Sequence, residues 1–284
     1  MSDKAILFNT TRCIACRGCQ VACKQWNETD EVIPTEQNSV RSVNRGSYEN
    51  PPDLSPKTWM TIKFIEKPQG DSIEWFFNRR SCMHCTEAAC VEVCPSGALY
   101  HNEDGFVTYD KDKCTGCGYC EQYCPFDVPR LDTNIVTGVG KMDKCTLCTT
   151  PSLNRLSAGE EPACVNTCPT HALVFGDRDE LISEAKTLVT GLQTTGSRVY
   201  PKATLYGEQE LGGLHVLYVL TDSPGVYGLP ENPQFPIAAT LQRDVFRPLT
   251  KVVWLMVAGG LALNVLIAWF RQRQLSEENS HGND

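Results

Sequence analysis

Sixteen cysteines constrain the fold of this 284-residue chain more than any other feature. They begin at Cys13 and end at Cys168, and the last 116 residues (284 − 168) contain none. They form four motifs: C-x2-C-x2-C-x3-C in motifs one and three, C-x2-C-x4-C-x3-C in motif two, and C-x2-C-x15-C-x3-C in motif four. Proline follows the last cysteine of motifs two to four, whereas Lys24 follows that of motif one. The motifs are, in order, Cys13, Cys16, Cys19 and Cys23; Cys82, Cys85, Cys90 and Cys94; Cys114, Cys117, Cys120 and Cys124; and Cys145, Cys148, Cys164 and Cys168.

Disulfides, zinc and iron–sulfur clusters are three competing uses of these cysteines. Disulfides are disfavoured because adjacent C-x2-C pairs rarely bridge well and Met1–Thr10 lacks the long apolar stretch of a secretory signal. Zinc would accept two C-x2-C pairs, but it needs neither a third cysteine three residues on nor a fourth followed by proline. The run C-x2-C-x2-C-x3-C-P is typical of bacterial ferredoxins. Sixteen cysteines at four per cluster predict four [4Fe–4S] clusters with none left over.

The ferredoxin pattern also predicts local structure. Three cysteines of one tight loop face one cluster, and the loop's backbone N–H groups point at its sulfur atoms. The fourth cysteine is expected to open the next helix and to point to the neighbouring cluster. Gly18, Gly116 and Gly118 are expected where the backbone needs a positive φ or a close approach. The small Ala98 and Ala172 are expected to pack where a larger side chain would press on a cluster.

Periodicity predicts few regular elements outside these loops. Asp177 is expected to cap a helix over residues 178–188. Residues 30–54 and 149–163 read as irregular loops, and Asp222–Pro236 as an extended linker outside the core. The predicted strands are Ala5–Phe8 and His215–Leu220, with hairpins formed by Thr58–Glu66 and Ser72–Phe77 and by Ala98–Tyr100 and Phe106–Tyr109.

Val252–Phe270 is a stretch of 19 uncharged residues with one amide, Asn264. At about 1.5 Å per residue it approaches the ~30 Å thickness of a bilayer core. Trp254 and Trp269 lie near its ends, where interfacial aromatic residues belong. These features predict a transmembrane helix, with a buried core helix as the alternative. The flanking basic residues leave its orientation open: Arg243, Arg247 and Lys251 before it, and Arg271 and Arg273 after it.

Other functions find little support in the composition. A net charge of −8 argues against a nucleic-acid partner, which would favour a basic surface. No Ser/His/Asp group, phosphate-binding loop or pair of carboxylates suggests a catalytic site on this chain. The five histidines are expected to be structural or solvated and not haem ligands: His84, His101, His171, His215 and His281.

Taken with the cysteine motifs, several further runs resemble the iron–sulfur (beta) subunit of membrane-bound respiratory formate dehydrogenase. The motifs up to Cys168 are shared by a broad group of four-cluster subunits of molybdopterin enzymes and hydrogenases. More particular to formate dehydrogenase are Gly-Leu-Pro-Glu-Asn-Pro at 228–233 and the single C-terminal transmembrane helix. The other runs that carry the resemblance are Cys-Gln-Val-Ala-Cys-Lys-Gln-Trp-Asn at 19–27, Cys-Thr-Gly-Cys-Gly-Tyr-Cys at 114–120, Cys-Pro-Phe-Asp-Val-Pro-Arg-Leu at 124–131 and Gly-Glu-Glu-Pro-Ala-Cys-Val-Asn-Thr-Cys-Pro-Thr at 159–170.

The resemblance implies an α+β fold of two interleaved, loop-rich ferredoxin-like units plus one C-terminal transmembrane helix. Residues 1–78 and 135–178 would form the first unit and 79–134 the second, followed by a docking region and linker (179–247), the membrane helix (248–271) and a tail (272–284). It also implies four ligand sets: Cys13, Cys16, Cys19 and Cys168 for cluster 1; Cys23, Cys145, Cys148 and Cys164 for cluster 2; Cys82, Cys85, Cys90 and Cys124 for cluster 3; and Cys94, Cys114, Cys117 and Cys120 for cluster 4.

In function, the resemblance implies a non-catalytic electron-transfer subunit. It would pass electrons from a molybdenum- or tungsten-pterin subunit, which oxidises formate, to a membrane cytochrome b that reduces quinone. The chain would cross the inner membrane of the cell once, with its soluble part in the periplasm and its C-terminus in the cytoplasm. The alternatives are the equivalent subunit of a membrane-bound hydrogenase or other molybdopterin oxidoreductase, and a zinc-stapled scaffold without redox function.

Overall fold

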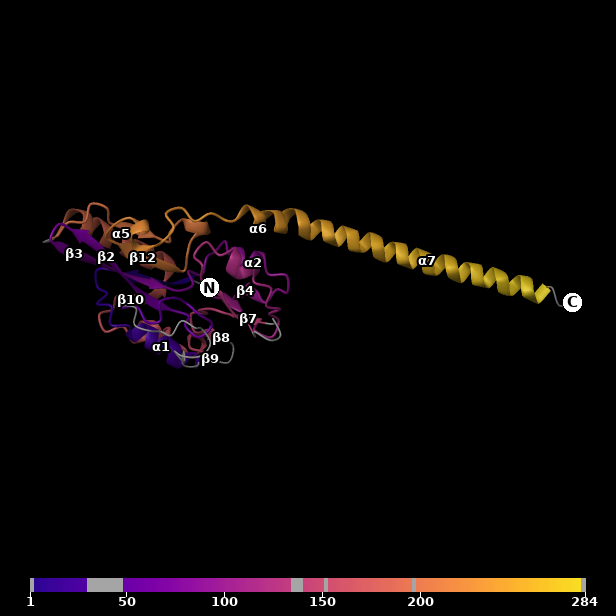
Figure 1. The fold of residues 1–284 in the computed structure, drawn as a ribbon, viewed down its shortest axis with the longest axis horizontal. Helices are drawn as coiled ribbons and strands as arrows, with labels where there is room; N and C mark the ends of the chain where they lie inside the picture. Colours follow the sequence, from indigo (N-terminus) through magenta and orange to yellow (C-terminus); the bar gives the residue numbers. More distant parts are fainter. Residues whose placement is uncertain (1–2, 30–47, 134–139, 151–152, 196–197, 282–284) are drawn as a thin grey trace. The chain divides into compact units, whose positions relative to one another are not determined.

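The computed structural model describes residues 3–29, 48–133, 140–150, 153–195 and 198–281. The chain divides into two compact units, Met1–Pro236 and Ile237–Asp284 (Figure 1). The strands are β1 (Lys4–Asn9), β2 (Thr61–Gln69), β3 (Ser72–Arg80), β4 (Leu99–His101), β5 (Val107–Tyr109), β6 (Arg130–Thr133), β7 (Gly140–Asp143), β8 (Thr149–Thr150), β9 (Leu153–Asn154), β10 (Leu173–Asp177), β11 (Thr204–Tyr206) and β12 (Val216–Leu220). The helices are α1 (Gly18–Trp26), α2 (Ala89–Glu92), α3 (Tyr119–Gln122), α4 (Ala163–Asn166), α5 (Arg178–Thr194), α6 (Ile237–Leu241) and α7 (Arg247–His281), with 3₁₀ turns at Leu156–Ala158, Glu210–Gly212 and Pro224–Tyr227.

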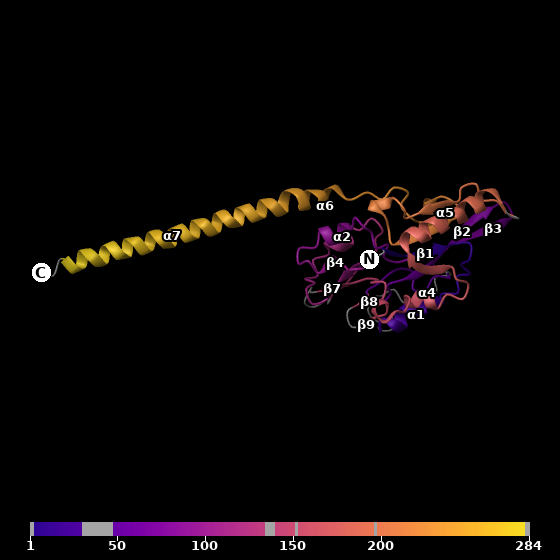
Figure 2. The ribbon, with the colours of Figure 1, turned by 180° about the vertical axis from the view of Figure 1, so that it is seen from behind.

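A four-stranded sheet organises the first unit, with strand order β10-β1-β12-β11. Strand β1 pairs antiparallel with β10 and parallel with β12, so Ile6 lies opposite Phe175 on one side and Val216 on the other. Side chains alternate between the two faces of the sheet, as a strand requires. Helix α5 lies against one face of the sheet (Figure 2). Leu7 and Leu217 pack with this helix, and the other face contributes to the core that contains the cysteines.

The predicted hairpins are confirmed, and one is longer than predicted. Strands β2 and β3 pair from Thr61–Arg80 to Gln69–Ser72, so the turn falls at residues 70–71. The predicted first strand ends at Glu66, whereas in the structure Pro68 still belongs to β2 and pairs with Ile73. A ribbon of only two strands leaves outer edges where the missing N–H of proline costs no ladder hydrogen bond. Strands β4 and β5 pair as predicted around the Asp104-Gly105 turn.

The short helices lie between the third and fourth cysteines of their motifs, which corrects the expectation that the fourth cysteine opens the next helix. Helices α2, α3 and α4 each contain the third cysteine and end before the fourth. Proline after the fourth cysteine explains the early end, because a residue before proline avoids the helical conformation. Motif one has Lys24 at this position, and its helix α1 continues to Trp26.

Strand β12 and helix α5 are confirmed, and α5 continues six residues beyond the predicted end at 188. Its N-terminus is capped as expected, because the Asp177 carboxylate accepts a hydrogen bond of 3.2 Å from the N–H of Asp179.

The prediction that Asp222–Pro236 lies outside the core was wrong. Tyr227 and Leu229 are buried in the main core, and the Asn78 side chain donates a hydrogen bond of 2.7 Å to the Tyr227 carbonyl. The Tyr227 hydroxyl also lies 2.7 Å from the hydroxyl of Thr221. The high proline and glycine content of the segment is typical of a linker, and it gives no sign that Tyr227 and Leu229 are core residues.

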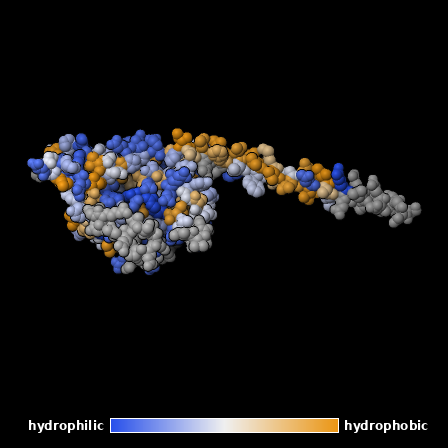
Figure 3. All heavy atoms as spheres, viewed as in Figure 1, coloured by the Kyte–Doolittle hydropathy of each residue, from blue (hydrophilic) through white to orange (hydrophobic). Residues whose placement is uncertain are grey.

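The second unit is helical. Helix α6 leads through a π-helical segment, Gln242–Phe246, into α7. Ile237–Trp269 is long and apolar enough to cross a membrane, and its large apolar side chains are exposed within this unit (Figure 3). The one amide of the predicted span, Asn264, donates a hydrogen bond of 2.9 Å to the Gly260 carbonyl one turn earlier, which satisfies it inside an apolar helix.

Two expected loops are only partly described. In the segment 30–54, residues 30–47 lie outside the described part of the chain. The segment 149–163 contains the small β8–β9 pair and the 3₁₀ turn Leu156–Ala158 before helix α4 begins. It is therefore more ordered locally than the expected irregular loop.

Candidate iron–sulfur cluster sites

All four C-x2-C loops share one backbone feature. The residue just before the second cysteine has a positive φ in each: 53° at Ala15, 49° at His84, 71° at Gly116 and 54° at Leu147. This conformation turns the chain sharply around the cysteine sulfur. In motifs one and four the N–H of that residue donates a hydrogen bond of 3.4 Å to the Sγ of the first cysteine. The loops therefore aim backbone donors at sulfur, as a cluster-binding loop requires.

Glycine is required in motif three but not in motif one. A Cβ on Gly116 would lie 2.2 Å from the Gly140 carbonyl oxygen, and Gly118 has a φ of 80°. The expectation for Gly18 was wrong, because its φ is not positive and a Cβ there would meet only ordinary contacts. Arg17 occupies the position equivalent to Gly118 and takes the positive φ, 60°, itself.

Cysteines of motifs one and four lie together. Burial raises the pKa of the Cys13 thiol, and the nearby Cys168 and Cys16 raise it further. Burial likewise raises the pKa of Cys23 well above its usual value, and the largest contribution from another cysteine comes from Cys145. Helix α1 packs against α4 in the same region. The cysteines that interact here are Cys13, Cys16, Cys19, Cys23, Cys145, Cys148, Cys164 and Cys168.

Cysteines of motifs two and three form a second region. Burial raises the pKa of Cys90 well above its usual value, and the charges of Cys124 and Cys82 raise this pKa further. Burial raises the pKa of Cys120 to about 12, with further contributions that include Cys94. Helices α2 and α3 pack against each other here. Each region thus brings together cysteines that are far apart in the sequence.

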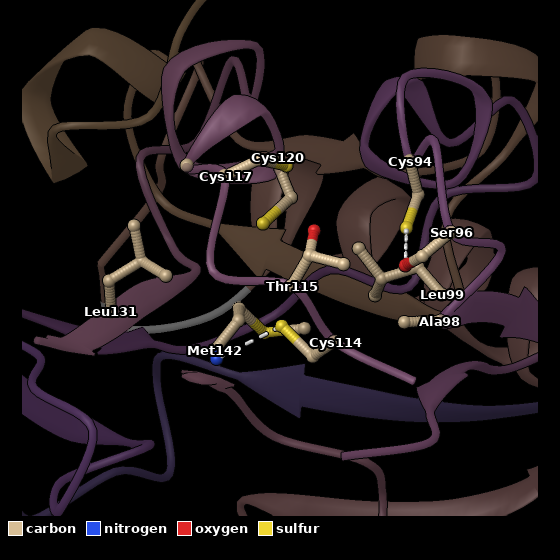
Figure 4. Close-up of a pocket in the computed structure, with 11 residues that line it drawn as sticks. Cys94, Ser96, Ala98, Leu99, Cys114, Thr115, Cys117, Cys120, Leu131 and Met142 are labelled. Atoms are coloured by element: carbon tan, nitrogen blue, oxygen red, sulfur yellow. Dashed lines mark hydrogen bonds between the residues drawn. The ribbon is translucent and has the colours of Figure 1, made fainter. Parts of the chain in front are cut away.

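One pocket is lined by four cysteines from two motifs: Cys94 of motif two, and Cys114, Cys117 and Cys120 of motif three (Figure 4). The Met142 N–H donates a hydrogen bond of 3.4 Å to Cys114 Sγ. The Cys94 Sγ lies 3.6 Å from Ser96 Oγ. Ala98 lines the pocket too, where the sequence predicts a small side chain.

The chemistry of these sites fits iron–sulfur clusters. Burial favours the neutral thiol, whereas iron binds the thiolate. The positive charge of bound iron stabilises the thiolate and so allows a buried cysteine to act as a ligand. The structure also contains buried polar atoms with no hydrogen-bond partner among the described residues, including the Arg79 Nε donor and the two ring nitrogens of His84, one of which is a donor in the neutral ring. Donors of this kind suit the sulfur atoms of a cluster. Within the described residues, no three His, Cys, Asp or Glu side chains are placed to share a single metal ion.

Three of the described histidines make contacts within the protein, whereas His171 is exposed. His101 Nε2 lies 3.1 Å from the Cys85 carbonyl, and His215 Nδ1 lies 2.8 Å from the Lys4 carbonyl. His84 packs edge-on against Phe106. The side chain of His281 lies outside the described part.

Comparison with known proteins agrees with this chemistry. Residues 12–98 and 73–178 each match the 4Fe-4S dicluster domain. These matches and the mixed strand and helix content give a fold built from two ferredoxin-type regions.

The chain is similar over most of its length to several named proteins. The chain is 40% identical to the formate dehydrogenase iron-sulfur subunit of Haemophilus influenzae, over 91% of this chain and 77% of that protein. It is 40% identical to the formate dehydrogenase-O iron-sulfur subunit of Escherichia coli, over 88% of this chain and 78% of that protein. The hydrogenase-2 operon protein HybA of Escherichia coli is more distant, at 32% identity over 98% of this chain and 87% of that protein. The chain therefore belongs to the family of formate dehydrogenase iron-sulfur subunits.

Proposed function

We propose that this chain is the electron-transfer subunit of a membrane-bound formate dehydrogenase. The observation that carries the proposal is that all sixteen cysteines gather in two neighbouring regions, each supplied by two motifs. When bound there, iron–sulfur clusters supply one-electron transfer. The chain's own part is to hold the clusters, to exclude water from them and to orient backbone donors toward their sulfur.

We assign four [4Fe–4S] clusters to four ligand sets. Support comes from the electrostatic neighbours of the buried cysteines, most of which fall within these sets, and from the pocket that the fourth set lines. The domain division follows: residues 1–78 with 135–178, and residues 79–134, each holding two clusters. The sets are Cys13, Cys16, Cys19 and Cys168; Cys23, Cys145, Cys148 and Cys164; Cys82, Cys85, Cys90 and Cys124; and Cys94, Cys114, Cys117 and Cys120.

The proposed sets follow one another in a line. Some of the described electrostatic interactions connect cysteines of two different sets. In each of these cases the two sets are consecutive in the order given above. A line of this kind lets electrons pass from one end of the region to the other by short steps. The pairs that join consecutive sets are Cys19 with Cys164, Cys145 with Cys82, and Cys90 with Cys120.

The two ends of the proposed line are the places where cysteines reach the surface. Cys16 of set one and Cys117 of set four are the two exposed cysteines. Apolar side chains flank them: Ile14 and Val21 are 61% and 62% exposed near the first, and Tyr119 is 40% exposed near the second. Exposed apolar side chains beside a redox site favour docking of partner subunits there. We assign these partners as a molybdenum- or tungsten-pterin catalytic subunit and a membrane cytochrome b.

The C-terminal helix supplies the membrane anchor in this proposal. Its apolar side chains have no protein to cover them within their own unit, and a lipid bilayer would cover them. We propose that it crosses the inner membrane once, with residues 1–236 in the periplasm and the tail after Arg271 in the cytoplasm. Labelling of single introduced cysteines on either side of the membrane tests this orientation.

A membrane-bound hydrogenase is the second candidate, because a hydrogenase-2 operon protein is among the relatives. The lower identity, 32% against 40%, favours formate dehydrogenase. Purification of the complex in mild detergent separates the two candidates. A molybdopterin protein in the complex supports formate dehydrogenase, and a nickel–iron large subunit contradicts it.

Metal analysis of the same complex tests the cofactor. Acid-labile sulfide at about sixteen per chain is expected, which is four per cluster for four clusters, and iron is expected to exceed it because the haem of the cytochrome also contains iron. Zinc without labile sulfide would show that the chain is a zinc-stapled scaffold without redox function.

A further inference from the structure

Arg79 on strand β3 is a buried cation without an acidic partner. Only 1% of its surface is exposed. Its Nη1 donates a hydrogen bond of 2.5 Å to Ser81 Oγ, and its Nη2 lies 4.0 Å from Cys164 Sγ. Its Nε has no hydrogen-bond partner among the described residues, and none of their carboxylates lies within ion-pair distance of it. Such a charge costs several kcal/mol to bury unless a negative group compensates it.

The groups around Arg79 that acquire negative charge are cysteine sulfurs. It interacts with Cys164, Cys145 and Cys19, which belong to proposed sets one and two. Its backbone is held in place, because the Tyr218 hydroxyl donates a hydrogen bond of 2.6 Å to the Arg79 carbonyl. A guanidinium keeps its proton at any pH at which the protein is folded, so its charge is fixed.

We propose that Arg79 raises the reduction potentials of the two clusters held by motifs one and four, and most of all that of the cluster held by Cys23, Cys145, Cys148 and Cys164. Reduction adds one electron, and hence one negative charge, to a cluster. A fixed positive charge in a poorly solvated site stabilises the reduced form more than the oxidised form. Arg79 thereby favours passage of the electron through the interior of the protein. The inference rests on the proposed function and adds to it the residue that tunes the potential.

Arg80, the next residue along β3, provides a matched control. Its guanidinium is partly exposed and forms ion pairs of 2.7 Å with Asp53 and 2.8 Å with Asp127. Two carboxylates and solvent therefore offset its charge. Arg80→Gln removes the same formal charge from the same strand. For every cluster, it is expected to change the ratio of reduced to oxidised form at a fixed potential by less than twofold.

The test is a redox titration of the purified complex, followed by electron paramagnetic resonance, in wild type, Arg79→Gln, Arg79→Lys and Arg80→Gln. In Arg79→Gln, the ratio of reduced to oxidised form at a fixed potential is expected to fall at least tenfold for one cluster, which is about 59 mV for a one-electron couple. Arg79→Lys retains a charge and is expected to restore the ratio to within threefold of wild type.

Four unchanged potentials in an Arg79→Gln protein with full iron content would overturn the inference and leave the proposed function intact. A wild-type complex without labile sulfide would overturn the proposed function itself. If Arg79→Gln loses iron, the redox titration of Arg79→Lys is used to test the inference. A tenfold shift in Arg79→Lys with full iron content would then show that packing, and not charge, is the contribution of Arg79.

Discussion

The hydroxyl of Tyr109 donates a hydrogen bond of 2.8 Å to the carboxylate of Asp143, and both side chains are buried. The bond joins the end of strand β5, just before motif three, to the end of β7, just before motif four. Lys111 completes the site with an ion pair of 2.8 Å to the same carboxylate. The approach to two cysteine motifs is thus fixed by one buried carboxylate.

Tyr109→Phe is expected to destabilise the protein, because it removes one donor from a buried carboxylate. The expected cost is about 1–3 kcal/mol. For a protein of this size each kcal/mol lowers the thermal midpoint by about 2–4 °C. Tyr100→Phe on β4 is the control, since Tyr100 is exposed and its hydroxyl has no described partner. Equal midpoints for the two variants would contradict the assigned role of this bond.

Gly116→Ala is expected to remove the cluster held by set four. A Cβ would lie 2.2 Å from the Gly140 carbonyl oxygen, so the loop has to move. Iron and labile sulfide are expected to fall by about a quarter, the share of one cluster in four. Gly97→Ala is the control, because Gly97 also has a positive φ, 63°, but a Cβ there would meet no atom within 4 Å. Full iron content in Gly116→Ala would refute the prediction.

Cys168→Ser is expected to alter the cluster held by motif one and to spare the one held mainly by motif four. Cys168 lies close to Cys13, although 155 residues (168 − 13) separate them. The resonance spectrum of the reduced protein should therefore lose or change one signal. Cys164→Ser is the matched variant and should change a different signal. An anomalous-scattering map with Cys168 bound to the Cys145/Cys148 cluster would show that this pairing is wrong.

His215 is expected to make the fold less stable as the pH falls below about 6.5. Burial lowers its pKa, although the Lys4 carbonyl and Asp3 act in the opposite direction and Arg178 and His101 add to the lowering. The unfolded chain then binds a proton more readily than the folded one. Stability is therefore full above the unfolded value of about 6.5 and declines as the pH falls toward the folded pKa.

Thermal midpoints at several pH values between 7 and 5.5 check this prediction. His215→Gln is expected to show a shallower decline than wild type. Parallel curves for wild type and His215→Gln would contradict it.

Truncation after Thr250 is expected to leave the clusters in place and to release the protein from the membrane. The helical unit Ile237–Asp284 is separate from the unit that contains every cysteine. The truncated protein should have wild-type iron content per chain and should partition into the soluble fraction. Unchanged assembly with the cytochrome subunit would count against the helix as anchor.

The sequence was most informative where chemistry fixes spacing. The cysteine motifs, the Asp104-Gly105 hairpin and the cap at Asp177 depend on local residue types, and the structure contains the corresponding elements. The positive φ values at Ala15 and Leu147 could not be predicted, because neither residue type prefers that conformation. The geometry of the loop imposes it.

Two other features depend on contacts between distant segments. Tyr227 appears in a proline-rich stretch that resembles a linker, and only its packing against Phe76 reveals it as a core residue. Arg79 and Arg80 are identical in type and adjacent in sequence, yet one is buried beside cysteine sulfur and the other lies partly exposed beside two carboxylates. Strand alternation predicts that they point to opposite faces, but it does not predict that Arg79 is the one buried beside cysteine sulfur.

The parallel pairing of β1 with β12 sets the earliest time at which the protein can fold. Strand β1 leads directly into motif one, and its partner ends 211 residues (220 − 9) later. At about 5–20 residues per second, roughly 10–40 s of synthesis pass before both strands exist. During that interval the first cysteines are accessible and lack their native neighbours. Insertion of iron and sulfur into the two sets of motifs one and four is therefore expected to follow completion of residues 1–220, so that the cell must protect these thiols of the growing chain until then.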